Sequence, residues 1–148
     1  MRLLIDTNVL LRLAEPEERE YPVVRRAVDT LLDHGDELCF IPQNLVEFWN
    51  VCTRPASRNG FGPTIAETNT RAQQMESKYT LLPDTERVHI EWRRLVVAHS
   101  VSGAQVHDAR IVAAMLAHGV TQLITLNPRD FQRFTEITVL HPNDLTTD

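Results

Sequence analysis

The sequence predicts an α/β domain with a mostly parallel central sheet of about five short strands. Along the 148 residues, short apolar runs of strand length alternate with segments whose apolar residues have helical spacing. A hydrophobic content of 43% with 24% charged residues is ordinary for a globular protein with a buried core. Strands that alternate with helices favour a parallel sheet covered by helices, and residues 1–148 have the length of a single domain.

The predicted strands are short apolar runs bounded by polar or turn-forming residues. They are Leu3 to Ile5, Leu38 to Ile41, a possible strand at Tyr79 to Leu82, Gln122 to Thr125, and Ile137 to Leu140. In open sheets of this class, ligands bind outside the carboxyl ends of the strands, where the strand order reverses. Asp6 ends the first run and Asn127 follows the fourth, so we expect both polar groups at this edge of the sheet.

The predicted helices have apolar residues three and four positions apart and begin or end at capping residues. They extend from an Asp6-Thr7-Asn8 cap through Leu13, and over Val23 to Leu32, Leu45 to Thr53, Thr64 to Ser77, Asp84 to His99, and Val106 to His118. Gly35 and Gly119 are expected stop signals, and Pro42-Gln43-Asn44 opens the third helix. The stretches Glu15 to Glu20 and Arg54 to Pro63 are expected to be exposed connections.

The composition argues against several classes of protein. No apolar segment approaches the roughly 20 residues of a membrane helix. Asp6 follows only three apolar residues, unlike the core of a secretory signal, so we expect a cytoplasmic protein without membrane insertion. Cys39 and Cys52 fit neither a disulfide framework nor a CxxC metal site and are expected to be reduced core residues. The formal net charge of −5 opposes broad affinity for nucleic acid, although metal ions at an acidic site would restore positive charge locally.

Three acids, Asp6, Glu47 and Asp108, are the main candidates for a functional role. Asp6 and Asp108 lie at predicted helix starts, where capping and the helix dipole alone would account for an aspartate. Glu47 lies among apolar residues of its helix, where an ionised carboxylate must reach solvent or find a partner. Two carboxylates at about 4 Å repel by about 4 kcal/mol at an effective dielectric of 20, so three together need a cation or a bound proton.

The donor types indicate which cation such a site would take. Oxygen ligands without Cys or His point to Mg²⁺ or Mn²⁺ rather than zinc. His107, beside Asp108, is expected to pack or to hydrogen-bond, since no other histidine lies at ligand spacing to it. Asn127, with Pro128 next and Asp130 three residues on, has a capping pattern that is compatible with a metal role. Such a site can activate water for hydrolysis of a phosphodiester.

Four segments resemble the PIN-domain family, and within it the VapC-type toxins of bacterial toxin–antitoxin pairs. They are LLIDTNVLL, IPQNLVEFWNVCTRP, GAQVHDARIVAAMLAHGV and ITLNPRDF, which stand in the family's order and touch most of the chain. The resemblance implies a three-layer α/β/α fold and a Mg²⁺-dependent endoribonuclease, with Mn²⁺ as a substitute, that leaves a 3′-hydroxyl. It also implies a homodimer and a cognate antitoxin, whose C-terminal segment enters the acidic groove.

The resemblance assigns site residues by position. Asp6, Glu47 and Asp108 match the family's metal-binding acids. The fourth acidic position falls at Asn127, with Asp130 three residues later, so a second metal ion depends on what these two residues supply.

Polar residues around these acids are further candidates. Groups that would orient the carboxylates or water, or serve only as caps and strand ends, are Thr7, Asn8 and Thr125. Loop arginines that would contact RNA phosphates, or remain solvated surface charges, are Arg54, Arg58 and Arg129.

Other classes fit the residues less well. The haloacid-dehalogenase pattern needs a second aspartate where Asn8 stands, and a response-regulator receiver needs a lysine after a late strand, whereas the only lysine is Lys78. Walker A and GxGxxG loops are absent from the sequence, which argues against nucleotide-cofactor chemistry. A PIN-like scaffold that binds RNA or a protein without cutting stays open, because Asn127 and the acidic net charge favour it.

Overall fold

A five-stranded sheet, parallel throughout, forms the centre of the computed structural model, which describes residues 1–55 and 62–145. The described strands are β1 (Arg2–Ile5), β2 (Glu37–Phe40), β3 (Thr80–Leu81), β4 (Gln122–Ile124) and β5 (Thr138–Leu140). Their order in the sheet is β3-β2-β1-β4-β5, with β1 in the centre and every neighbouring pair parallel. The predicted α/β class and the number of short strands are therefore confirmed.

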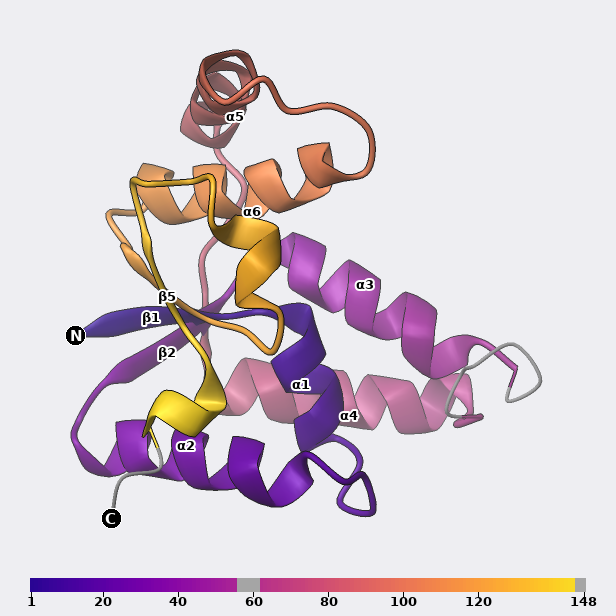
Figure 1. Cartoon of the computed structure of the whole chain (residues 1–148). Helices are drawn as coiled ribbons and strands as arrows, with labels where there is room; N and C mark the ends of the chain where they lie inside the picture. The colour runs from indigo at the N-terminus through magenta and orange to yellow at the C-terminus, as the bar shows by residue number, and fades with distance from the viewer. Residues whose placement is uncertain (56–61, 146–148) are drawn as a thin grey trace.

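Helices cover both faces of the sheet (Figure 1). They are α1 (Thr7–Leu13), α2 (Tyr21–Asp33), α3 (Pro42–Thr53), α4 (Ile65–Lys78), α5 (Glu86–Ala98) and α6 (Gln105–Ala117), with short 3-10 helices η2 (Pro128–Phe131) and η3 (Pro142–Leu145). Figure 1 shows α5 and α6 on one side of the sheet and α2 and α4 on the other. This arrangement is the expected three-layer α/β/α architecture.

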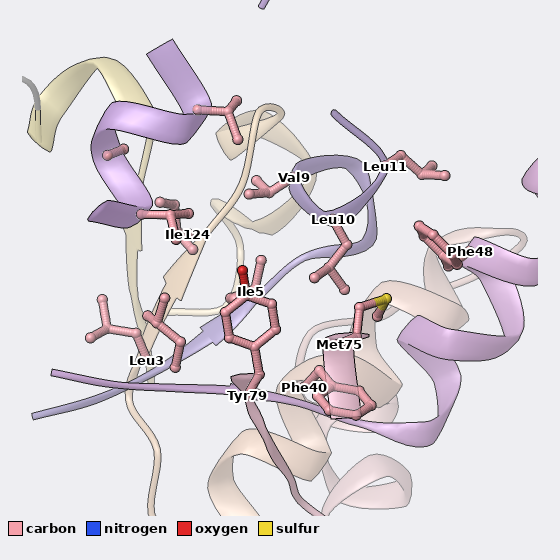
Figure 2. Close-up of a cluster of buried hydrophobic side chains, with 14 of the residues drawn as sticks. Leu3, Ile5, Val9, Leu10, Leu11, Phe40, Phe48, Met75, Tyr79 and Ile124 are labelled. Carbon is pink, nitrogen blue, oxygen red and sulfur yellow. The ribbon is translucent and has the colours of Figure 1, made fainter. Parts of the chain in front are cut away.

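The alternation of side chains along β1 separates the core into two clusters. Leu3 and Ile5 pack with helices α1 to α4, and this cluster includes Phe48 and Met75 (Figure 2). Leu4 points to the other face and packs in the cluster that contains residues of α5 and α6. A strand that is buried on both faces reads as a continuous apolar run, which is why the sequence shows no polar alternation here.

The predicted element bounds differ from the observed ones mainly at helix starts. The helix expected from Val23 begins at Tyr21, because Pro22 fits the first turn of a helix, where its missing amide is not needed. The possible strand at Tyr79 to Leu82 is reduced to the exposed edge strand β3. Cys39 and Cys52 are free and buried, as expected. None of the described helices is long and apolar enough to cross a membrane.

A buried ion-pair centre on α5 gives a stability prediction that depends on pH. Glu91 is 8% exposed, and it accepts hydrogen bonds from Arg87 and Arg94. The bonds from Arg94, opposed in part by burial and helped by Arg87, hold the pKa of Glu91 below its usual value. This stabilisation is present above the unfolded pKa, and it is lost as the pH falls through the folded pKa.

We expect Glu91→Gln to lower the free energy of unfolding by about 1 kcal/mol at pH 7, because the charged hydrogen bonds are weakened. The difference from wild type should shrink as the pH is lowered toward 3, because Glu91 takes up a proton as the pH falls through its folded pKa. Urea unfolding at both pH values measures this, with the exposed substitution Glu17→Gln as control. A difference of equal size at both pH values would contradict the argument.

Candidate active site

The site lies where the order of the sheet reverses, between β1 and β4. The chain runs outward from β1 through β2 to β3, and then returns to place β4 on the other side of β1. Asp6 follows β1 directly and Thr125 follows β4 directly. The backbone N–H of Asp6 donates to the carbonyl of Ile124 at 3.0 Å. The structure thus places these polar groups together at the carboxyl edge, where open α/β sheets bind ligands.

Asp6 is held by neutral donors on both carboxylate oxygens. Its Oδ1 accepts from the backbone N–H of Thr7 and its Oδ2 from the Thr125 hydroxyl, both at 2.8 Å. The Thr125 hydroxyl oxygen in turn accepts from Asn8 Nδ2 at 3.2 Å and from the backbone N–H of Asn127 at 3.1 Å. Asp6 also caps α1, so its capping role and its place in the acidic site coexist.

Glu47 is held through a second threonine. It lies on α3, and its Oε1 accepts from the Thr7 hydroxyl at 2.7 Å. The Thr7 oxygen accepts from Asn44 Nδ2 at 3.1 Å. Asn44 is fully buried and was not among the residues singled out from the sequence. An asparagine three residues after the start of a proline-opened helix gives no sign of burial, so its contact across to α1 required the structure.

Asp108 lies in the first turn of α6, whose start is tied to the start of α3. Gln43 Nε2 donates to the carbonyl of His107 at 3.0 Å, and Arg110 donates to Gln43 Oε1 at 3.3 Å. The helix that carries Glu47 and the helix that carries Asp108 are therefore linked by a residue that the sequence did not indicate. The His107 side chain is exposed rather than packed.

Asn127 directly precedes η2, and Asp130 lies within it. The backbone N–H of Asp130 donates to the Asn127 carbonyl at 3.1 Å, which fits the predicted turn. Asn127 is the N-cap residue of η2 with Pro128 next, as predicted, but its side chain makes no capping hydrogen bond. The backbone N–H of Asn127 donates to the Thr125 hydroxyl instead. The 3-10 turn is closed by the backbone bond from Asp130 to Asn127.

Burial and mutual repulsion raise the pKa of two of the acids. Burial is the largest cause of the raised pKa of Asp6, about 6; charges on Glu47 and Asp130 add to it, and the bonds from Thr125 and Thr7 oppose it. The pKa of Asp108 is also raised to about 6, first by burial and then by the charges on Asp130, Asp6 and Glu47. The four acids are thus close enough to act on one another electrostatically.

Cations of the protein do not neutralise this cluster. Among the ion pairs of residues 1–55 and 62–145, none includes Asp6, Glu47, Asp108 or Asp130. The hydroxyls of Thr125 and Thr7 and the backbone N–H of Thr7 donate to oxygens of Asp6 and Glu47 without cancelling their charge. An oxygen-rich, negatively charged set of this kind fits a hard divalent cation.

The acids do not, however, converge into a ready-made metal cage. Within the described parts of the chain, no group of three His, Cys, Asp or Glu side chains is positioned to hold an ion. Repulsion between carboxylates without a cation favours this separation, because bringing two charges to about 4 Å costs about 4 kcal/mol at a dielectric of 20. The chemistry of the donors nevertheless fits a hard divalent cation.

The candidate arginines are placed less uniformly. Arg129 lines a pocket of about 340 Å³ together with Asn127 and Asp130, so it lies beside Asp130. Arg54 stands at the far end of α3, seven residues beyond Glu47 and therefore about 10 Å along the helix. The third candidate, Arg58, lies outside the described residues.

The fold and the acids together define an α/β protein with an acidic centre at the carboxyl edge of its sheet. The family model of the PIN domain matches residues 3–137, and the chain belongs to the PIN domain family. No sequence among the curated proteins matches the chain significantly.

Solved structures of toxin–antitoxin proteins share the fold. VapBC-1 from nontypeable Haemophilus influenzae matches with a TM-score of 0.71 and 17% identity over 96% of this chain and 98% of the other. VapBC2 from Rickettsia felis, bound to a promoter DNA fragment, matches with a TM-score of 0.70 and 13% identity, over 95% of this chain and 98% of the other. VapC20 from Mycobacterium tuberculosis, a toxin that cleaves the sarcin-ricin loop, matches with a TM-score of 0.59 and 15% identity, over 82% of this chain and 86% of the other.

The raised pKa of Asp108 predicts a site that costs stability when no metal is added. An acid whose folded pKa exceeds its unfolded value destabilises the protein when ionised, and this cost disappears as the pH falls through about 6 toward 3.8. We expect Asp108→Asn to raise the free energy of unfolding at pH 7.5 in chelator by about 1 kcal/mol, after allowance for partial solvent screening.

Thermal unfolding at pH 7.5 and at pH 4 measures this effect. The gain should be a few degrees at pH 7.5 and should fade at pH 4, where the wild-type acid is protonated. Glu17→Gln removes an exposed acid and should leave the melting temperature nearly unchanged. A destabilised Asp108→Asn at pH 7.5 would show that the carboxylate is instead a net structural support.

Proposed function

We propose that this protein is a Mg²⁺-dependent endoribonuclease, the toxin of a type II toxin–antitoxin pair, acting as a single PIN domain over residues 1–148. The observation that carries the proposal is the set of four mutually repelling acids at the switch point of a PIN-domain fold, which take part in none of the ion pairs of the described residues. A negative, oxygen-rich centre without Cys or His suits Mg²⁺, with Mn²⁺ as a substitute.

Asp6, Glu47 and Asp108 would hold a first ion, and Asn127 and Asp130 are the groups that would contribute to a second. When bound, such an ion supplies positive charge that activates a water and stabilises the leaving oxygen of a phosphodiester. The chain's own part is to present ionised oxygens in fixed directions. The Thr125 hydroxyl and the Thr7 backbone hold both oxygens of Asp6, while the Thr7 hydroxyl holds one oxygen of Glu47.

RNA is the proposed substrate, and arginine side chains are its proposed phosphate contacts. Arg129 is the strongest candidate because it lines the pocket that Asn127 and Asp130 also line. Arg54, at the end of α3, would contact the RNA farther from the reacting phosphate, and Arg58, the third proposed contact, lies outside the described residues.

A cognate antitoxin is the proposed protein partner. VapBC structures from Haemophilus influenzae and Rickettsia felis share the fold of this chain, and both are named as the paired system. In this proposal an antitoxin segment blocks the acidic site, the toxin forms a homodimer, and the complex acts in the cytoplasm.

A PIN-like scaffold that binds RNA or protein without cutting is the second candidate. Two observations favour it: an asparagine stands at the fourth acidic position, and the described residues hold no preformed group of three metal ligands. An assay for RNA cleavage distinguishes the two functions.

We expect purified protein to cleave RNA in millimolar Mg²⁺ or Mn²⁺ and to stop when the metal is chelated. Asp6→Asn should lower the rate at least about 100-fold, because one ligand of the proposed ion loses its charge. Gel analysis of a labelled RNA pool measures both effects, with Glu17→Gln as the charge-matched control. Equal cleavage by wild type and Asp6→Asn, or none with any metal, would reject the nuclease.

Metal binding also makes a prediction that does not depend on cleavage. Millimolar Mg²⁺ should raise the melting temperature of the wild type by a few degrees, since a ligand that binds only the folded state stabilises it. Asp6→Asn should abolish most of the shift, whereas Glu17→Gln should keep it. Differential scanning calorimetry with and without Mg²⁺ measures this, and an unchanged wild-type melting temperature would count against an ordered metal site.

A further inference from the structure

Asn44 uses both ends of its side-chain amide while fully buried on α3. Its Oδ1 accepts from the backbone N–H of Ile41 at 2.9 Å, and its Nδ2 donates to the Thr7 hydroxyl oxygen at 3.1 Å. Because the Ile41 N–H can only donate, it must meet the amide oxygen, and this fixes which end of the amide faces Thr7. The orientation of Asn44 is therefore determined by the main chain of its own helix.

This orientation fixes the hydrogen of the Thr7 hydroxyl. A hydroxyl has one hydrogen to donate, and the Thr7 oxygen already accepts from Asn44. Its hydrogen is thus directed to Glu47 Oε1, 2.7 Å away. Glu47 is therefore the acceptor at that oxygen, and its Oε2 receives no hydrogen bond from this pair.

The geometry points to Asn44 as a positioning residue for the metal site, acting on Glu47 through the Thr7 hydroxyl; the inference rests on the proposed metal-binding function. Without the Asn44 amide, the Thr7 hydroxyl is free to rotate, and the hydrogen bond that orients the Glu47 carboxylate is no longer enforced. Asn44 itself does not touch the acids, so it is not a catalytic residue.

The same arrangement occurs a second time in the site. Asn8 Nδ2 donates to the Thr125 hydroxyl oxygen, and the Thr125 hydroxyl donates to Asp6 Oδ2. The Asn8 amide is oriented by a backbone N–H as well, because its Oδ1 accepts from Leu126. Two acids from two different helices are thus held by an amide, a hydroxyl and a carboxylate in series, which argues that the Asn44 contact belongs to the site.

A capping role alone would explain only half of the Asn44 contacts. The bond from Ile41 closes the first turn of α3 and contributes stability, as caps do. The bond to Thr7 instead joins residues 37 positions apart, and it leads to Glu47. The chain supplies a matched comparison in α4, where Thr64 and Glu67 form a capping box on an exposed helix start.

The experiment measures Mn²⁺ binding to the purified protein by electron paramagnetic resonance of the free ion, together with thermal stability. We expect Asn44→Ala to weaken Mn²⁺ binding about tenfold, the scale of losses when a group that orients a metal ligand is removed. Thr64→Ala should lower stability to a similar degree and leave Mn²⁺ binding unchanged. Asn44→Ser also removes the amide but keeps a polar atom in the buried position. It should weaken Mn²⁺ binding to a similar degree, and it replaces Asn44→Ala in the experiment if that variant does not fold.

A double-mutant cycle tests whether Asn44 acts through Thr7. Thr7→Val keeps the shape of the side chain and removes the hydroxyl, so in this background Asn44→Ala should cause no further loss of Mn²⁺ affinity. If the two substitutions weakened Mn²⁺ binding independently and additively, Asn44 would not act through Thr7. The inference would also be overturned if Asn44→Ala bound Mn²⁺ as tightly as the wild type while Glu47→Gln bound it poorly. Unchanged binding in Glu47→Gln would overturn the proposed metal site itself, and the role of Asn44 with it.

Discussion

The repulsion among carboxylates at the junction of β1 and β4 is the constraint on which the rest of the structure depends. Burial raises the pKa of Asp6 most, and the charges on Glu47 and Asp130 raise it further, so ionising Asp6 is costly. Ion pairs elsewhere in the described chain neutralise other acids, such as Glu15 and Glu91, but none of them includes an acid of this cluster. The remaining fold must therefore supply enough stability to hold a centre that is unfavourable when empty of positive charge.

The sheet supplies that support through its topology. β1 is central and buried on both faces, so Asp6 is anchored at the end of the central strand. The crossover from β3 to β4 brings Thr125 beside Asp6, the second turn of α3 carries Glu47, and the first turn of α6 carries Asp108 to the same edge. Neutral donors then fix the carboxylates. Had arginines been used instead, they would have cancelled the charge that a divalent cation requires.

The sequence was sufficient for the elements and for most of the acids, because both follow from local patterns. Apolar runs of three or four residues predicted the strands, and an aspartate directly after the first run predicted a polar group at the carboxyl edge. Asn44 and Gln43 escaped prediction because their importance lies in contacts with residues 37 and 64 positions away. The edge strand β3 was uncertain for a similar reason: its two residues are exposed and are defined by pairing with β2.

The acidic net charge, which at first opposes a nucleic-acid substrate, follows from the same constraint. The chain carries a formal charge of −5, and the four acids of the site contribute to it without protein counter-ions. A polyanion approaching this edge meets like charge unless a cation is present. In the proposed function, metal binding therefore precedes productive contact with RNA, since it reverses the local field. The amide–hydroxyl–carboxylate series that hold Asp6 and Glu47 keep these carboxylates directed for that first step.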